Sequence, residues 1–170
     1  MDLFHNNVQK WLSKYPEDKM LMDSLEALTL PFSVSNCSTN SGMPNLKIDF
    51  PPNGDGPVFL HSQEDPLAEA KAWFASLYLA NVDVIYVYGI GLGYYYDAAV
   101  DWLKENRDHY LVFIEDDPQV MRRFLETERC SEMLDDSQVC IVMMGHRSGQ
   151  VIQFTRLTAL FNSLKFVYTG

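Results

Sequence analysis

The chain has 170 residues, of which 47% are hydrophobic, and its formal net charge at pH 7 is -10. This length allows one domain with a sizeable buried core, and the negative charge disfavours nucleic acid as a partner because it repels phosphates. The longest apolar run, within residues 84–92, is shorter than the roughly 20 residues of a membrane-spanning helix, and the N-terminus lacks the pattern of a secretory signal. We therefore expect a cytoplasmic protein with no membrane partner.

The 3 cysteines include no C-x-x-C pair, and the 4 histidines show no H-x-x-x-H spacing. Neither a disulfide framework nor a histidine metal site is indicated, so reduced thiols and no metal are predicted.

Two helices and three short strands are predicted before residue 63. Apolar side chains recur with helical spacing after Asp2, a residue suited to cap a helix, and Pro16 ends this first helix. The second helix, over about residues 17–28, should bury three leucines: Leu21, Leu25 and Leu28. Turns rich in Asn, Gly and Pro then separate short extended runs, which is typical of antiparallel hairpins. These strands are expected near residues 32–36, 45–50 and 58–61.

From residue 63 onward, helices and strands alternate, which is typical of a parallel sheet with right-handed crossovers. Asp65-Pro66 and Asp117-Pro118 each join an N-cap to a proline at the first helical position, so each should begin a helix. The first of these helices should bury the stripe Leu67, Ala70, Phe74, Leu77 and Tyr78. Strands are predicted at residues 84–88, 110–114 and 138–143, with a fourth near 165–168. Further helices are predicted at residues 94–105, 118–126 and about 150–164.

The predicted fold is therefore α/β, with a Rossmann-like three-layer parallel sheet over residues 63–170. An N-terminal helical and β-hairpin region over residues 1–62 precedes it. A complete doubly wound nucleotide fold commonly has five or six strands, so this sheet is either minimal or the front part of a longer domain.

A glycine-rich turn follows the first strand of the predicted parallel sheet. The run V-Y-G-I-G-L-G-Y places Gly89, Gly91 and Gly93 at alternate positions. Ligands bind outside the carboxyl ends of parallel strands, and glycine lets the backbone approach them closely. Tyr94 replaces the last glycine of a dinucleotide fingerprint and G-K-[ST] is absent, which disfavours nicotinamide binding and a P-loop. A nucleotide-sugar turn, an S-adenosylmethionine turn and a turn without ligand remain.

Several side chains are candidates for the ligand site at this edge. Glu115 ends the second parallel strand, where a carboxylate can bind ribose hydroxyls. With Asp116 and Asp117 it could instead hold Mg²⁺, although Asp117 also suits a helix cap. At least one tyrosine of residues 94–96 should face the cleft and stack on a base or sugar.

Two loops could complete this site. His61 and Ser62 end the hairpin region and could approach the cleft, or they could simply form a loop before the next helix. The loop at residues 145–149 reaches the same edge, and Arg147 within it is a candidate phosphate contact.

Three segments together carry a family resemblance: L-H-S-Q-E-D-P-L-A-E-A, V-Y-G-I-G-L-G-Y and F-I-E-D-D-P. They resemble the MptE-like family, which includes the motility-associated factor (Maf) flagellin glycosyltransferases and the archaeal 6-hydroxymethylpterin pyrophosphokinases. The matching residues, in order, are His61, Ser62, Asp65, Pro66, Glu69, Ala70, Gly89, Gly91, Gly93 and Tyr94. The similarity covers about residues 45–143.

The resemblance implies a Rossmann-like domain that binds an activated nucleotide. In the Maf branch this would be a CMP-linked nonulosonic acid, transferred to flagellin or another protein acceptor; in the pterin branch it would be ATP with Mg²⁺. Maf proteins are much longer, so this chain would be an N-terminal part of one. The glycine turn and Glu115 fit a class I S-adenosylmethionine-dependent methyltransferase equally well, and a non-catalytic scaffold is the third reading.

Overall fold

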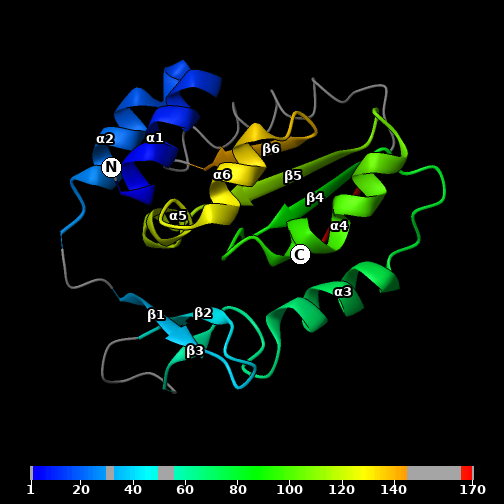
Figure 1. Cartoon of the computed structure of the whole chain (residues 1–170), viewed down its shortest axis with the longest axis horizontal. Helices are drawn as coiled ribbons and strands as arrows, with labels where there is room; N and C mark the ends of the chain where they lie inside the picture. Colours follow the sequence, from blue (N-terminus) through cyan, green and yellow to red (C-terminus); the bar gives the residue numbers. More distant parts are fainter. Residues whose placement is uncertain (1, 30–32, 50–55, 145–165, 170) are drawn as a thin grey trace.

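A computed structural model describes residues 2–29, 33–49, 56–144 and 166–169 of the chain. It confirms the predicted α/β class, with helices around a parallel sheet, an N-terminal helix pair and a small antiparallel sheet (Figure 1). The predicted helix at about 150–164 and the loop at 145–149 lie outside the described residues. No helix in the described ranges is both long and apolar enough to cross a membrane.

The larger sheet is parallel and Rossmann-like. Its described strands are β4 (Val84–Tyr88), β5 (Tyr110–Glu115), β6 (Val139–Met143) and β7 (Phe166–Thr169). They lie in the order β6-β5-β4-β7, so the chain builds outward from β4 on one side and then crosses to the other. In open sheets of this kind, ligands bind outside the carboxyl ends of the strands at the point where the order reverses. That point lies beside the carboxyl end of β4, where the glycine turn begins.

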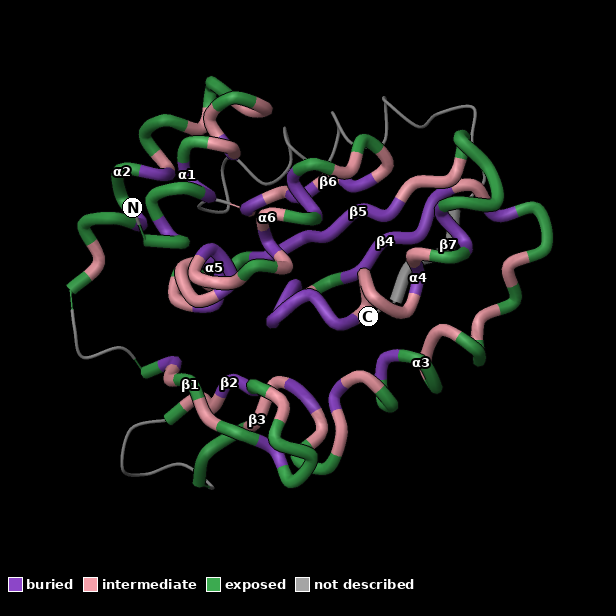
Figure 2. Tube along the Cα trace, viewed as in Figure 1, coloured by how far each residue is buried: buried purple, intermediate pink, exposed green. Residues whose placement is uncertain are grey.

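Both faces of the central strands are buried, as their apolar sequence predicts (Figure 2). Ile85 and Phe113 belong to the large core cluster on one face. Val84 and Val112 belong to a second cluster on the opposite face. This double burial fixes the strand ends firmly and so gives the turns that follow them a rigid base.

Three helices follow the first two parallel strands: α4 (Tyr94–Glu105), α5 (Pro118–Phe124) and α6 (Glu128–Asp135). The first has the predicted bounds, and Asp117 caps the second through the amides of Gln119 and Val120. The third was not predicted, because the sequence was expected to pass from a helix ending near Glu126 to the next strand. Thr127 caps it by accepting a hydrogen bond from the Cys130 amide.

The N-terminal segment forms α1 (Leu3–Lys14), a 3-10 turn at Pro16–Asp18 and α2 (Lys19–Glu26). Asp2 caps α1 through the His5 amide, as predicted. Of the three leucines predicted to be buried, Leu25 is fully buried, and Leu21 and Leu28 are partly buried and pack against the core. Met22, which was not predicted, is also buried. The 3-10 turn delays the start of the helix to Lys19, two residues after the predicted start.

The helix α1 is tied to the α/β core by a buried amide. The Nδ2 group of Asn7 donates to the carbonyl of Leu125 at 2.9 Å and to that of Thr127 at 2.8 Å. The amide thereby joins α1 to the segment between α5 and α6.

The small sheet comprises β1 (Val34–Ser38), β2 (Pro44–Ile48) and β3 (Val58–Phe59), antiparallel as predicted. It is joined to the core through α5. The Gln119 side chain accepts a hydrogen bond from the Ser33 amide at 2.7 Å, and the Arg123 Nε donates to the Val34 carbonyl at 3.2 Å. The sheet is thus held beside the carboxyl edge of the parallel strands (Figure 1).

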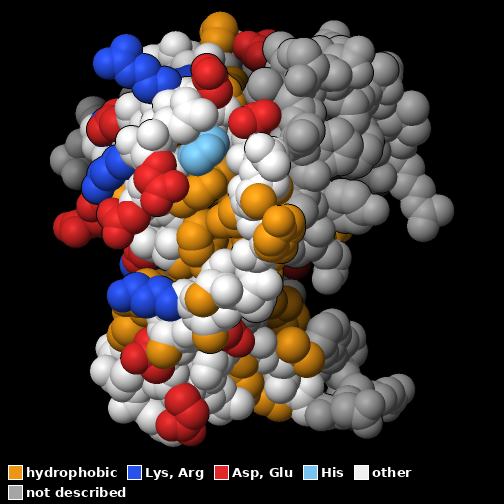
Figure 3. Space-filling view, turned by 90° about the vertical axis from the view of Figure 1, so that its right-hand side faces the viewer, with side chains coloured by type: hydrophobic (Ala, Val, Ile, Leu, Met, Phe, Trp, Pro, Cys, Tyr) orange, Lys and Arg blue, Asp and Glu red, His pale blue; other side chains and the backbone are white. Residues whose placement is uncertain are grey.

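Helix α3 (Pro66–Ser76) connects the two sheets and begins with the predicted Asp65 cap. It buries only Pro66 and Ala70, and much of it is exposed (Figure 2). The predicted burial of Tyr78 is wrong: its side chain is 83% exposed. The helix ends at Ser76, so Tyr78 no longer follows the helical stripe. Figure 3 shows the apolar side chains that gather on the side of the molecule at the right of Figure 1.

Candidate ligand cleft at the glycine turn

The turn between β4 and α4 requires glycine at three positions. Gly89, Gly91 and Gly93 have φ angles of +86°, +50° and +79°, in the left-handed region that side chains with a Cβ rarely adopt. The alternation of glycines in the sequence is therefore a conformational requirement of this turn.

Most backbone amides of the turn donate to acceptors within the protein. Gly89 N–H donates to the Ile114 carbonyl at 2.7 Å, and Gly93 N–H donates to the Ile90 carbonyl at 2.8 Å. Ile90 N–H donates to Glu115 Oε2 at 3.0 Å, and Leu92 N–H donates to His61 Nε2 at 3.0 Å. Four of the five amides from residue 89 to residue 93 are thus already paired.

His61 reaches the turn from the end of the small sheet. Its backbone is held on both sides by Asn45, whose Oδ1 accepts from the His61 amide at 3.0 Å and whose Nδ2 donates to its carbonyl at 2.8 Å. The ring is only 6% exposed and packs edge-on against Tyr94. Burial, with a smaller contribution from Arg129, lowers the pKa of His61 to about 4. At neutral pH the ring is therefore uncharged, with Nε2 as acceptor and the proton on Nδ1.

Side chains of the protein fill the space above two of the three glycines. A Cβ on Gly91 would collide with the imidazole of His61, and one on Gly93 would lie 2.7 Å from Cδ of Arg129. A Cβ on Gly89 would meet nothing within 4 Å. Gly89 is therefore the glycine of this turn that faces open space.

Glu115, at the end of β5, joins two loops. Its Oε2 accepts from Ile90 N–H, and its Oε1 accepts from the amides of Asp116 and Asp117 at 2.9 Å each. Burial raises the pKa of the Glu115 carboxyl, and these three amide hydrogen bonds oppose that rise. A carboxylate has about four acceptor positions, so one remains for a ligand hydroxyl.

A cleft of about 380 Å³ lies between the small sheet and the carboxyl edge of the parallel sheet. Its described lining combines three carboxylates, two tyrosines, the glycine turn and apolar side chains: Ile48, Leu60, His61, Tyr88, Gly89, Gly91, Tyr95, Glu115, Asp116, Asp117 and Val120. Within that described lining there is no lysine or arginine. The cleft is thus negatively charged, with a partly apolar wall.

Tyr88 and Asp116 form a pair at the cleft. Tyr88 is 59% exposed, and its hydroxyl donates to Asp116 Oδ2 at 2.6 Å. This hydrogen bond, with a smaller contribution from burial, raises the pKa of Tyr88 to about 12. Asp116 is the exposed carboxylate of the three, so it offers free acceptor positions to a ligand.

The three consecutive tyrosines at the start of α4 point to different places. Tyr94 is buried, its hydroxyl donates to the Pro44 carbonyl at 2.7 Å, and it does not line the cleft. Tyr95 lines the cleft and packs against Trp73. The Tyr96 hydroxyl donates to Asp136 at 3.2 Å. Of the three tyrosines, Tyr95 is therefore the one that lies at the cleft.

Seven of the residues that the sequence analysis considered for the site line the cleft: His61, Gly89, Gly91, Tyr95, Glu115, Asp116 and Asp117. Gly93, Tyr94 and Ser62 are not in the described lining of the cleft. The Ser62 amide instead donates to Glu69 Oε2 at 2.8 Å. Arg147 lies outside the described residues. The described ranges contain no group of three or more His, Cys, Asp or Glu residues able to hold a metal ion.

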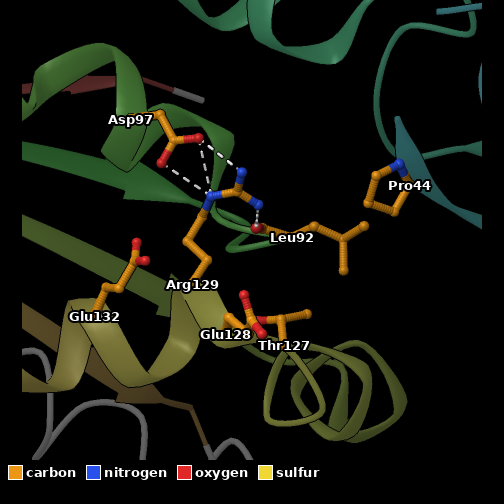
Figure 4. Close-up of a pocket in the computed structure, with 7 residues that line it drawn as sticks. All are labelled: Pro44, Leu92, Asp97, Thr127, Glu128, Arg129 and Glu132. Atoms are coloured by element: carbon orange, nitrogen blue, oxygen red, sulfur yellow. Dashed lines mark hydrogen bonds and ion pairs between the residues drawn. The ribbon is translucent and has the colours of Figure 1, made fainter. Parts of the chain in front are cut away.

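A residue that the sequence reasoning missed supports the turn from behind. Arg129, on α6, forms a bidentate ion pair with Asp97, with its Nη2 2.7 Å from Oδ2. Its Nη1 donates to the Leu92 carbonyl at 2.8 Å. Figure 4 shows this arrangement in a second cavity of about 430 Å³. Recognition of Thr127 as a helix cap would have drawn attention to Arg129.

Fold and cleft together define the class of the protein as a Rossmann-like α/β domain. No protein-family profile matches the chain, and no curated protein matches it. Among solved structures, MnmC2 from Aquifex aeolicus aligns with a TM-score of 0.36 and 16% identity, over 85% of this chain and 56% of that one. The chain thus spans a little over half the length of that structure. Similarity at this level assigns neither a family nor a function.

Proposed function

We propose that the cleft binds a nucleoside-type ligand without phosphate, and that S-adenosylmethionine is the cosubstrate of a methyltransferase-like domain. One observation carries this choice: the turn amides that would hold a phosphate already donate to Glu115, His61 and backbone carbonyls. A nucleotide turn instead presents its amides and the helix N-terminus to the phosphate.

The charge of the cleft supports the same ligand class. Its three carboxylates, with no cation in the described lining, repel a phosphate or pyrophosphate. They suit ribose hydroxyls, which donate to carboxylate oxygens, and the positive sulfonium and ammonium groups of S-adenosylmethionine. Asp116 is the carboxylate that we place on the ribose, because Glu115 has most of its acceptor positions filled.

Calorimetric titration of the protein tests this proposal. The ligands are S-adenosylmethionine, S-adenosylhomocysteine, CMP, CMP-sialic acid and ATP with Mg²⁺. We expect binding of the two adenosyl compounds only, weakened about tenfold by Asp116→Asn because one ribose hydrogen bond is lost. Asp101→Asn is the matched control, since the Asp101 side chain on α4 is 99% exposed and lies outside the cleft. Binding of CMP compounds alone would reject the adenosyl ligand.

A Maf-type glycosyltransferase domain with a CMP-linked nonulosonic acid donor is the second candidate. The observation in its favour is that the residues of the family resemblance meet in space. His61 contacts both the turn and Tyr94, and the Ser62 amide donates to Glu69, which follows the Asp65 cap. Binding of CMP-sialic acid in the same titration would favour this candidate, with flagellin as the acceptor to test next.

A further inference from the structure

The imidazole of His61 occupies the space above Gly91 and accepts the hydrogen bond of the Leu92 amide. In a phosphate-binding turn, the phosphate takes both of these positions, because glycine leaves room for it and the free amide donates to it. A side chain of the protein therefore stands where a phosphate would have to bind.

We propose that His61 determines specificity by excluding nucleosides that carry a 5′-phosphate from the cleft. This inference rests on the proposed nucleoside site and adds a cause for its selectivity. A ribose held at the carboxyl end of β5, by Asp116, directs its 5′ carbon toward the turn after β4. A 5′-phosphate would then meet the ring of His61 and find the Leu92 amide already paired.

The His61 ring is fixed in this position. Asn45 holds its backbone amide and carbonyl, and the ring packs against Tyr94 at 4.9 Å between centroids. Tyr94 is in turn anchored by its hydroxyl on the Pro44 carbonyl. A phosphate could take this position only by displacing the ring. Displacement would break both the hydrogen bond to Leu92 and the packing on Tyr94, and their loss would reduce the free energy of phosphate binding.

The remainder of the cleft stays accessible with His61 in place. Gly89 faces open space, and Tyr88 and Asp116 are exposed beside it. A base and ribose can therefore enter while the region above Gly91 is closed. The exclusion is directed at an anionic 5′ group, which needs the amide of Leu92 that His61 already occupies. The positive sulfonium at the 5′ end of S-adenosylmethionine needs no N–H donor and is attracted by the cleft carboxylates, so it is not excluded in the same way.

Titration of the wild-type chain with adenosine and AMP tests the proposal without any substitution. We expect adenosine to bind at least tenfold more tightly than AMP. Equal affinities would overturn the proposal. If the wild type bound neither adenosine nor S-adenosylmethionine, the proposed function itself would fail, and this inference with it.

Two variants then separate His61 from the cleft carboxylates, which also repel phosphate. His61→Ala frees the Leu92 amide and the space above Gly91, so the preference for adenosine over AMP should fall about tenfold. His61→Gln keeps an acceptor and most of the volume, so it should retain the wild-type preference. Circular dichroism checks that His61→Ala is folded. If this folded variant keeps the wild-type preference for adenosine over AMP, the carboxylates cause the exclusion and the proposed role of His61 is overturned.

Discussion

The Nε2 atom of His61 and the amide of Leu92 are joined by a hydrogen bond of 3.0 Å across the boundary between the small sheet and the glycine turn. The bond requires an uncharged ring, because a protonated Nε2 would carry a hydrogen that faces the Leu92 N–H. One of the contacts that attach the small sheet to the core therefore depends on the protonation state of a buried side chain.

Stability should fall as pH is lowered from about 6.5 toward 4. The folded-state pKa of His61 is about 4, below the ordinary value of 6.5, so the unfolded chain binds the proton first in this interval. The contribution of His61 is complete above pH 6.5 and should decrease by about 2 kcal/mol by pH 5. Urea unfolding at pH 7 and pH 5 measures it, and the loss specific to His61 should be absent in His61→Gln. Equal losses in both proteins would contradict the assignment.

Gly91→Ala should destabilise the protein more than Gly89→Ala. Both residues have positive φ, which costs a residue with a Cβ about 1–2 kcal/mol. Only the Cβ at position 91 collides with His61, which adds about 1–3 kcal/mol of overpacking. In a His61→Ala background this excess should disappear, since the ring is gone. The unfolding free energies of the wild type, Gly91→Ala, His61→Ala and the double variant form a double-mutant cycle. If the two substitutions have additive effects, the collision between the Cβ at position 91 and His61 does not contribute to the loss.

Glu115→Gln should cost about 2 kcal/mol of unfolding free energy. The amide that replaces one carboxylate oxygen cannot accept, so a buried backbone N–H from Ile90, or from Asp116 and Asp117, is left unpaired. Asp116→Asn is the matched control on the neighbouring, exposed carboxylate and should change stability by less than about 0.5 kcal/mol. Chemical denaturation compares the two. A similar small effect for both would mean that Glu115 does not hold the two loops.

Asp97→Ala and Arg129→Ala should show a coupling of about 1–2 kcal/mol. Both side chains are largely buried, with 26% and 20% exposure, and their geometry is bidentate. Arg129→Ala should have the larger single effect, because it also removes the donor to the Leu92 carbonyl. The exposed pair Lys104 and Asp101 is the control cycle and should give almost no coupling. If the coupling energy of Asp97 and Arg129 is no larger than that of Lys104 and Asp101, the buried ion pair does not stabilise the turn.

Local signals in the sequence were sufficient for most elements of the fold. Asp2, Asp65 and Asp117 each cap the predicted helix, since a carboxylate satisfies free amides wherever a helix starts. The apolar run of β4 indicated burial on both faces correctly, because such a run is stable only when covered. Helix α6 was missed, although Cys130, Met133 and Leu134 carry helical spacing after Thr127.

The cleft could be predicted only in part. The position of the glycine turn and Glu115 followed from strand order, since parallel strands bring their carboxyl ends to one edge. The turn amides could not be assigned to acceptors from the sequence, because His61 lies 31 residues away from Leu92. The same limit hid Tyr88, whose partner Asp116 is 28 residues away. Such pairings depend on tertiary packing, which spacing along the chain does not reveal.

The amide of Asn7 bridges to carbonyls that are synthesised 118 and 120 residues later. At synthesis rates of 5–20 residues per second, α1 must therefore wait roughly 6–24 s for its binding surface on α5 and α6 to emerge. During that time the apolar face that includes Phe4, Val8 and Trp11 lacks its partner surface on α5 and α6. Helix α1 is thus made long before the surface against which it packs.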